Sequence, residues 1–417
     1  MHTAVERCRI CGNRNLVEVL DLGVQVLTGI FPRTREQRVT AGPLRLVKCT
    51  GEPGCCGLLQ LSHSYDHGEM YGANYGYRSG LNSSMVQHLH DKVRKILTLA
   101  DLSGNPVVLD IGSNDGTTLR AYADVRCQLV GIDPTAEKFR HHYPADVKVV
   151  PEFFSAETFL KATQERKARI VTSFSMFYDL EDPLAFLGEV ARILEDNGLW
   201  VFEQSYMPLM LERTSYDTVC HEHLEYYALA QVQWMAERAG LKIVDVEFND
   251  VNGGSFSVTA AKAGSAYAEF RNLKQLLDKE RAGGLDGLSP YRAFASRTAA
   301  SREELRAFLA RAKARGQRIA GLGASTKGNV LLQYCGLTDR DLYAIGEVNE
   351  EKFGSYTPGS LIPIVPEREL LADEPEFLLV LPWHFRDFFL KKYKLKKASL
   401  VFPLPALETI PPRPDAA

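Results

Sequence analysis

The middle of the chain alternates short apolar runs with helix-like segments, and this alternation constrains the fold more than any other feature. The apolar runs occupy residues 107–112, 128–133, 147–150, 168–173 and 198–203. Runs of this length are typical of buried strands, whereas intervening segments such as Pro183 to Leu194 have the amphipathic pattern of helices. A further helix is expected over Ser84 to Leu102. Alternating strands and helices predict a doubly wound parallel sheet that binds its ligand at the strands' carboxyl ends.

The first of these strands ends in the motif DIGSNDG, residues 110–116, which opens into a helix. Gly112 and Gly116 allow the backbone to approach a ligand closely. The motif is not GxGxxG and no lysine follows it, so it is neither the dinucleotide fingerprint nor a P-loop. The second strand ends at Asp133, where a carboxylate accepts hydrogen bonds from ribose hydroxyls. Phe153, after the third strand, is a candidate to lie against a purine.

Cysteines cluster at the start of the chain. Cys8 and Cys11 form a CxxCG knuckle, and Cys49, Cys55 and Cys56 follow in a turn rich in Gly and Pro. Four thiolates make a closed tetrahedral site, so zinc bound here is structural. We favour Cys56 over Cys55 as the fourth ligand because a strand-like run follows it directly. The other readings are His63 or His67 as substitute ligands, or a set of free buried thiols.

The segment after the fifth strand contains His221, Glu222 and His223, followed by Tyr226 and Tyr227. A histidine beside carboxylates can act as a general base near neutral pH. The segment lies near the carboxyl end of the sheet, where a cofactor's reactive group would point. Half of a metal site and a purely structural role are the alternatives for these histidines.

Composition limits the classes of function. The chain has 417 residues, which suggests two to four domains at roughly 100–200 residues each. Its formal charge of −3 gives no bulk attraction to nucleic acid or anionic lipid. No apolar run approaches the roughly 20 residues of a membrane span, and the first residues lack a signal-peptide core. A cytoplasmic protein that binds neither membrane nor nucleic acid is therefore expected.

The last third of the chain predicts a second, smaller Rossmann-like sheet. Residues 318–329 form a strand, a glycine turn and a helix start, and further strands are expected at 342–349 and 377–381. Ser325 or Lys327 is placed to hold a pyrophosphate at the helix N-terminus. A long helix is expected over 292–316 and an interdomain connection over 265–290. The strand at 259–264 is expected to close the edge of the first sheet.

DIGSNDG, the acid-ended second strand and the fifth strand's NGLWVFE together resemble class I S-adenosylmethionine-dependent methyltransferases; an NAD-type site of similar layout is the alternative. Together with CxxCG, HEHLEYY and GLGASTKGN, they resemble the sugar C-methyltransferase family over nearly the whole chain. The resemblance implies an α/β fold with a zinc module (1–68), a methyltransferase domain (69–265) and a C-terminal Rossmann-like domain (266–417). It also implies methylation at C3 of a dTDP- or GDP-linked 4-keto-6-deoxy sugar by a monomer or homodimer.

Zinc loss is expected to unfold the first module and leave cofactor affinity mostly intact.

The resemblance also assigns roles to residues. His223 is the expected base, and Glu222 orients it or contacts substrate. Tyr75 and Tyr77 belong to a lid that contacts the sugar and stabilises the enolate. The expected cofactor residues are Gly112, Asn114, Gly116, Asp133, Phe153 and Ser173; the expected substrate residues are Tyr75, Tyr77, Ser79, His221, Ser325 and Lys327; the expected zinc ligands are Cys8, Cys11, Cys49 and Cys56.

The sequence departs from the family pattern at three positions. Cys220 replaces a tyrosine, Asp179 lies in a loop that often carries a histidine, and Asn252 replaces a histidine before two glycines. These positions face the expected substrate, so the sequence does not determine which sugar is bound or which of its carbons is methylated. A sugar O-methyltransferase and a non-catalytic zinc-bearing binding protein are the alternative functions.

Overall fold

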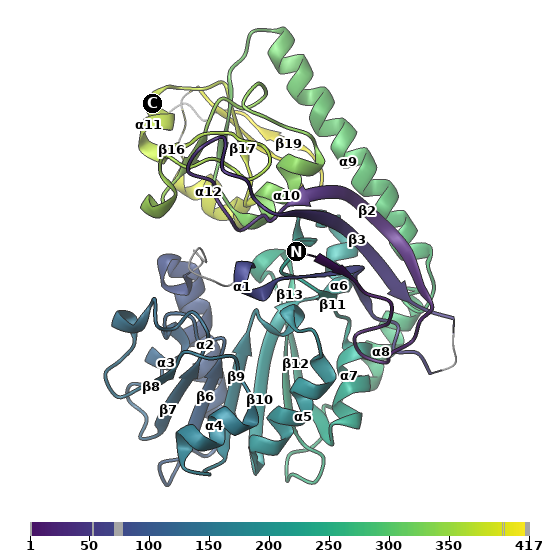
Figure 1. Cartoon of the computed structure of the whole chain (residues 1–417), viewed down its shortest axis with the longest axis vertical. Coiled ribbons are helices and arrows are strands. Elements are labelled where there is room, and N and C mark those ends of the chain that lie inside the picture. The colour runs from purple at the N-terminus through teal and green to yellow at the C-terminus, as the bar shows by residue number, and fades with distance from the viewer. Residues whose placement is uncertain (1, 52–53, 71–77, 394, 396, 413–417) are drawn as a thin grey trace.

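The computed structural model describes residues 2–51, 54–70, 78–393, 395 and 397–412. These residues form three sheets of four, six and seven strands and a small two-stranded ribbon (Figure 1). In the described ranges, no helix combines the length and the apolar character needed to cross a bilayer.

The seven-stranded sheet confirms the five strands predicted for the middle of the chain. It contains β6 (Val107–Ile111), β7 (Gln128–Ile132), β8 (Lys148–Val150), β9 (Ala168–Phe174) and β10 (Leu194–Ser205), all parallel to their neighbours in this set. The strand order is β12-β13-β10-β9-β6-β7-β8. The order therefore reverses between β9 and β6, and a ligand site is expected outside the carboxyl ends of these two strands.

Helices connect these strands as the alternation predicts. They are α2 (Ser83–Leu99), α3 (Thr117–Arg120), α4 (Ala156–Thr163), α5 (Pro183–Ile193), α6 (Met207–Glu212) and α7 (Leu229–Arg238). Helix α5 begins where its sequence predicts, because the Asp182 side chain accepts from the Ala185 amide and a proline occupies the first turn.

One prediction about this sheet is wrong. The strand expected at the edge is β13 (Ser255–Lys262), which lies inside the sheet, antiparallel to both β10 and β12 (Leu241–Asn249). The edge strand is β12. Its buried side chains alternate with partly exposed ones, whereas β13 is buried along nearly its whole length because strands cover both of its sides.

The N-terminal residues form an antiparallel sheet with the order β11-β4-β3-β2. Strands β2 (Leu16–Val26), β3 (Ala41–Cys49) and β4 (Leu59–Leu61) come from the cysteine-rich module. The fourth strand, β11 (Glu225–Tyr226), comes from the HEH segment, and Glu225 pairs with Gln60. Strands β1 (His2–Ala4) and β5 (His63–Tyr65) make the ribbon, followed by α1 (His67–Met70). The segment with the expected base is therefore part of the N-terminal sheet.

The C-terminal sheet has the order β16-β15-β14-β17-β18-β19, parallel except for its last strand. Its strands are β14 (Ile319–Leu322), β15 (Ile345–Glu347), β16 (Ile364–Pro366), β17 (Phe377–Val380), β18 (Ser399–Phe402) and β19 (Glu408–Ile410). Its helices are α9 (Ser289–Ala314), α10 (Thr326–Tyr334), α11 (Glu367–Ala372) and α12 (Arg386–Lys392). Helix α9 runs beside β2, so the first and last parts of the chain lie together (Figure 1).

The expected interdomain connection contains a helix, α8 (Leu273–Ala282), which packs on α7. The buried Glu280 side chain accepts from the Leu229 and Ala230 amides at 2.7 and 3.0 Å and from the Tyr206 hydroxyl at 2.6 Å. It caps the N-terminus of α7 in place of a local residue. Helix α8 therefore packs with the methyltransferase-like sheet.

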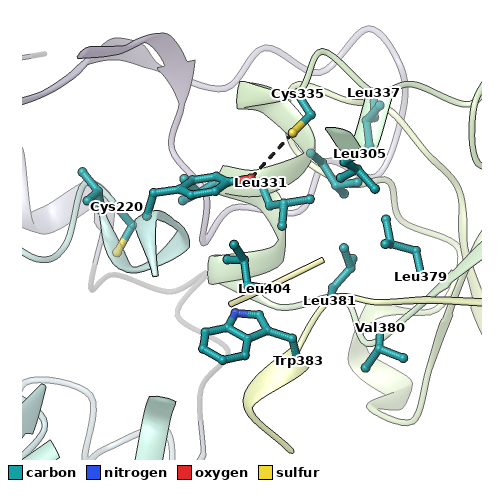
Figure 2. Packing of buried hydrophobic residues seen from close by; sticks show 14 of the residues in the cluster. Cys220, Leu305, Leu331, Cys335, Leu337, Leu379, Val380, Leu381, Trp383 and Leu404 are labelled. Carbon is teal, nitrogen blue, oxygen red and sulfur yellow. Dashed lines mark hydrogen bonds between the residues drawn. The ribbon is translucent and has the colours of Figure 1, made fainter. Parts of the chain in front are cut away.

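One hydrophobic cluster joins the N-terminal sheet, the HEH segment and the C-terminal sheet. Figure 2 shows Cys220 of the HEH segment and Trp383 of the C-terminal domain within this cluster. The Tyr216 hydroxyl contacts the Cys335 sulfur of α10 at 3.7 Å. The HEH segment is thus held from both sides by parts of the chain that are distant in sequence.

Candidate functional site

Four cysteines form a compact group at the start of the chain. The ligand atoms of Cys8, Cys11, Cys49 and Cys56 all lie within 4.8 Å of one another. The Cys8–Cys56 and Cys11–Cys49 sulfur pairs are 3.3 and 3.5 Å apart, close to the roughly 3.8 Å expected for tetrahedral Zn–S bonds of about 2.3 Å. The group contains Cys56, which the sequence favoured as the fourth ligand, and does not contain Cys55. His63 is also outside it and contacts the Ser62 hydroxyl instead.

Polar groups surround these thiolates. The Asn13 side-chain amide points at the Cys49 sulfur at 3.4 Å. Lys48 is 1% exposed, and its ammonium donates to the Gly57 carbonyl at 2.5 Å and lies over the Tyr291 ring of α9. A tetrathiolate zinc site carries net negative charge, and a buried ammonium beside it compensates that charge.

A cavity of about 260 Å³ opens at the carboxyl ends of β6 and β7. Its wall includes five of the predicted residues, which are Ser79, Gly112, Asn114, Asp133 and Phe153. Gly112 has φ +70°, and a Cβ there would lie 3.1 Å from the Met176 Cγ, so the close approach requires glycine. The Asp133 carboxylate accepts from the Asn114 amide at 2.8 Å and from the Thr135 amide and hydroxyl at 2.6 Å each.

Two residues expected at the cofactor lie outside the wall. Ser173 is completely buried, and its hydroxyl accepts from the Trp200 indole N–H at 2.9 Å, so the wall is formed by the next residues, Phe174 to Met176. The glycine at position 116 has φ +74° at the start of α3, and a Cβ there would lie 2.7 Å from the Tyr143 ring. Ser173 and Gly116 therefore shape the site from behind.

Of the residues expected in the lid and next to it, the structure describes only Ser79. Tyr75 and Tyr77 lie outside the described residues. Ser79 is on the cofactor side, because it lines the cavity and its amide donates to the Asn114 side chain at 3.0 Å. The Gly80 amide donates to Asp115 in the same way. This contact differs from the sugar contact expected for Ser79.

His223 has the geometry of a base. Its Nδ1 lies 2.8 Å from the Thr218 carbonyl oxygen, which can only accept, so Nδ1 carries the proton and Nε2 keeps its lone pair. Burial, with the positive charge of Lys327, lowers the pKa of His223 to about 3. The ring packs against Tyr178 with centroids 4.3 Å apart. His223 is therefore neutral at physiological pH.

The other two members of the HEH segment face the N-terminal module. A Cβ added to Gly29 would lie 2.8 Å from the Glu222 Oε1, and the Thr28 hydroxyl lies 3.5 Å from Oε2. Burial raises the pKa of Glu222. His221 is completely buried edge-on to Tyr65 at 4.7 Å, a position that favours packing over substrate contact. The two histidines thus point to different neighbours and do not form half of one metal site.

The HEH segment is fixed at two points to residues 178–181, which include part of the cavity wall. The Leu224 amide donates to the Tyr178 carbonyl at 2.8 Å. Arg9, between two zinc ligands, is almost fully buried and donates to Glu181 at 3.3 Å, with Glu225 at 3.6 Å. Glu181 lines the cofactor cavity and Glu225 follows the base by two residues. The zinc knuckle, the cavity wall and the segment of the expected base therefore share one set of contacts.

The C-terminal motif GLGASTKGN lies at the junction with the other domains. The Ser325 hydroxyl accepts from the Gly328 amide at 3.0 Å and caps α10. The Lys327 ammonium donates to the Asn252 carbonyl at 2.7 Å, and Asn329 donates to the Thr28 carbonyl at 2.8 Å. Ser325 thus takes one of the free amides at the helix terminus that was expected to hold pyrophosphate, whereas Lys327 turns toward Asn252.

Sequence reasoning missed several residues of this site. Asp110 lines the cavity, and burial raises its pKa to about 7. The sequence feature that could have identified it is an acidic residue inside an apolar strand. Asp217 accepts from the Trp383 indole at 2.8 Å across the domain junction. Arg9 was visible only as a charged residue inside the knuckle. No local pattern predicts the partners of Asp217 and Arg9, because those partners are distant in sequence.

Three family models match successive parts of the chain. Family models match the chain as "Putative zinc binding domain" over residues 8–71, "Methyltransferase domain" over 85–246 and "C-methyltransferase C-terminal domain" over 250–405. The C-methyltransferase NovU of Streptomyces niveus is 29% identical over 407 residues, covering 96% of each chain.

Solved structures match part of the chain. The CcbJ methyltransferase from Streptomyces caelestis is 15% identical, with a TM-score of 0.33, and the match covers 42% of this chain and 89% of that one. LepI in complex with SAM is 13% identical, with a TM-score of 0.35, and the match covers 44% of this chain and 54% of that one.

The parallel sheet, its cavity at the carboxyl edge and the matching domain model define a methyltransferase that uses S-adenosylmethionine. The chain joins such a domain to a zinc-binding module and a C-terminal domain of the C-methyltransferase type, and it is similar along nearly its whole length to a C-methyltransferase. Its cofactors are S-adenosylmethionine and a structural zinc ion. The residues fit both groups, since Asp133 and Gly112 suit a ribose and a closely approaching ligand, and the four sulfur atoms suit zinc.

Proposed function

We propose that this methyltransferase adds a methyl group to C3 of a nucleotide-linked 4-keto-6-deoxy sugar. The observation that carries the proposal is the hydrogen bond from His223 Nδ1 to the Thr218 carbonyl, which leaves Nε2 as a base beside Tyr178, the residue that precedes Asp179 of the cavity wall. A carbon next to a ketone is acidic enough for such a base, whereas an ordinary C–H bond is not. The family match to C-methyltransferases supports carbon as the acceptor.

His223 Nε2 takes the proton from the carbon beside the ketone. The C–H electron pair forms the C=C bond of an enolate, and the carbonyl π pair moves to oxygen. S-adenosylmethionine, when bound, supplies an electrophilic methyl group on a positive sulfur. The enolate carbon forms the new C–C bond as the C–S bond breaks, and the proton remains on His223 until solvent removes it.

The low pKa of His223 sets a requirement on the rest of the site. A base with a pKa of about 3 removes a proton slowly unless the charge that develops in the transition state is stabilised. The enolate is negative and forms next to the imidazolium, so the two charges stabilise each other.

The four clustered cysteines must stay reduced to bind zinc. This supports action in a reducing compartment, and we propose the cytoplasm.

The direct experiment incubates dTDP- and GDP-4-keto-6-deoxyhexoses with the enzyme and S-adenosylmethionine in deuterated water, followed by mass spectrometry and NMR. We expect a product heavier by one methyl group on C3, and deuterium at that carbon in recovered substrate. A methyl group on oxygen without exchange would show an O-methyltransferase. Absence of any methylated product with either sugar would reject this substrate class.

A further inference from the structure

The Glu222 carboxyl group faces a turn of the zinc module, which Thr28 and Gly29 form just after β2. The Glu222 Oε2 lies 3.5 Å from the Thr28 hydroxyl, although the two residues are 194 positions apart. Gly29 approaches the other oxygen so closely that an added Cβ would lie 2.8 Å from Oε1. Both oxygens of the acid that precedes the expected base, His223, are therefore bounded by the N-terminal part of the chain.

The glycine at position 29 serves this close approach and not the backbone. Its φ lies outside the left-handed region that favours glycine, so other residues can adopt its conformation. Among the described residues, leaving out its chain neighbours, a Cβ at this position would meet only Glu222 within 4 Å. A separation of 2.8 Å is shorter than the roughly 3.5 Å of a favourable contact, so a side chain here must displace the carboxyl group.

Helix α10 of the C-terminal domain holds the turn in place. The completely buried Asn329, which ends the GLGASTKGN motif, donates to the Thr28 carbonyl at 2.8 Å. One helical turn later, the Gln333 side chain accepts from the Val26 amide at 2.9 Å and donates to the Val26 carbonyl at 3.2 Å. The backbone that leads into the turn is therefore hydrogen-bonded to α10 at two successive places.

Buried side chains fix the backbone on both sides of the contact. Leu27 and Ile30, which flank the turn, belong to the hydrophobic cluster shared with the C-terminal sheet. His221 and Leu224, which flank the HEH pair, are completely buried. Because neither backbone can yield, a side chain added at the turn would be accommodated by movement of the Glu222 carboxyl group, the flexible end of the contact.

We propose that the Thr28–Gly29 turn, held by Asn329, positions the Glu222 carboxyl group for the proton transfer to His223. This role rests on the proposed function, in which Glu222 contacts the substrate or orients His223. Both tasks require a carboxyl oxygen within hydrogen-bond distance of its partner, so a small displacement is costly. Gly29 and Asn329 are thus positioning residues, and the zinc module and the C-terminal domain both act on the reaction through one acid.

The competing interpretation is that Gly29 only allows the two modules to pack. The two interpretations differ in how they depend on the length of the acid. If Gly29 positions the carboxyl group, a methyl group at residue 29 is harmful only when the acid is long enough to meet it. If Gly29 serves packing alone, the same methyl group is equally harmful with a shorter acid, since the effects of independent changes add.

The test places Gly29→Ala in full-length wild type and in Glu222→Asp, whose carboxyl group is one methylene closer to the backbone. The control is Gly188→Ala, at an exposed position of α5 where a Cβ would meet nothing within 4 Å. Methyl transfer is measured with whichever dTDP- or GDP-linked 4-keto-6-deoxyhexose wild type methylates. We expect Gly29→Ala to lower kcat about 10-fold, with KM nearly unchanged. In Glu222→Asp the same change should lower kcat less than about two-fold, and the control should match wild type.

Binding measurements separate positioning from misfolding. Zinc per chain and the calorimetric Kd for S-adenosylhomocysteine should be the same in Gly29→Ala and wild type. Asn329→Leu, which keeps the size of the side chain and removes the donor to Thr28, should also lower kcat, by a smaller factor.

Several outcomes would overturn the role. They are a kcat in Gly29→Ala equal to that of wild type, an equal loss in both backgrounds, a change in KM alone, or loss of zinc or cofactor binding. An unchanged kcat in Asn329→Leu would remove the C-terminal domain from the role. If wild type methylates neither sugar, the proposed function fails and this role with it, whereas an active wild type with an equally active Gly29→Ala rejects the role of the turn alone.

Discussion

Arg9, which stands between the zinc ligands Cys8 and Cys11, donates through Nε to Glu181 in the wall of the cofactor cavity at 3.3 Å. The Ser64 hydroxyl donates to the same carboxylate at 2.7 Å, and Arg9 also donates to the Leu61 carbonyl at 2.7 Å. This set of contacts changes the expectation that the zinc module and the cofactor site are independent. A change at the knuckle therefore reaches a residue of the cavity wall directly.

Arg9→Gln should therefore weaken S-adenosylmethionine binding while zinc stays bound. Loss of one charged hydrogen-bond partner costs about 1–3 kcal/mol, so we expect a Kd roughly five-fold higher or more. Calorimetry measures the Kd, and elemental analysis measures zinc per chain. The exposed Arg14 of the same module supplies the control Arg14→Gln. Equal affinity in Arg9→Gln and wild type, with zinc retained, would show that the two sites are separate after all.

The pH profile should reflect the low pKa of His223. Burial and the charge of Lys327 hold that pKa at about 3, so the imidazole stays neutral as pH falls from 8 to about 5. The acid limb of kcat/KM assigned to this base should thus lie below pH 5. His223→Asn should lower kcat about 10²–10⁴-fold with S-adenosylmethionine affinity nearly unchanged. If the acid limb lies near the ordinary histidine pKa of about 6.5 and disappears in His223→Asn, the low pKa of His223 is wrong.

Asp133→Asn should weaken cofactor binding strongly. The carboxylate fixes the Asn114 amide and Thr135, and its remaining lone pair, on Oδ2, can accept from a ribose hydroxyl. Loss of charged hydrogen bonds of this kind costs about 1.5–3 kcal/mol, which is roughly 10- to 150-fold in Kd. Calorimetric titration with S-adenosylhomocysteine measures it. Asp124→Asn, at an exposed position of the same domain, is the matched control and should bind normally.

Glu280→Gln tests the packing of α8 on α7. The carboxylate accepts three hydrogen bonds in a nearly solvent-free position, and an amide cannot accept all of them. We expect the free energy of unfolding to fall by about 1–3 kcal/mol in urea titrations. The exposed Glu269 gives the control Glu269→Gln, which should unfold like wild type. Unchanged stability in Glu280→Gln would mean that α8 does not support α7.

The sequence predicted the central sheet well because its strands are short, apolar and separated by helices. It missed β12, where buried and partly exposed side chains alternate, and β11, which is only two residues long and exists through its partner β4. The CxxCG spacing indicated a zinc site, and the structure gathers those cysteines. Ser173 was misplaced because a strand alternates its side chains between two faces, and this one turns to Trp200.

The site itself was predictable where chemistry and position are local, as with Gly112 and Asp133. It was not predictable where two domains meet. Lys327 was expected at a phosphate, yet its contact is with Asn252, 75 positions earlier in the chain. The partners of Trp383 and Arg9 are likewise distant, so only the three-dimensional arrangement reveals them.

The pairing of β11 with β4 also limits how such enzymes can exchange parts. The zinc-bearing module ends early in the sequence, but the strand that completes its sheet is encoded far downstream, inside the segment that carries the base. A chimera that replaces only the first 70 or so residues would receive a sheet whose last strand comes from another parent. Recombination between relatives should therefore succeed only when both stretches are inherited together, as one discontinuous unit.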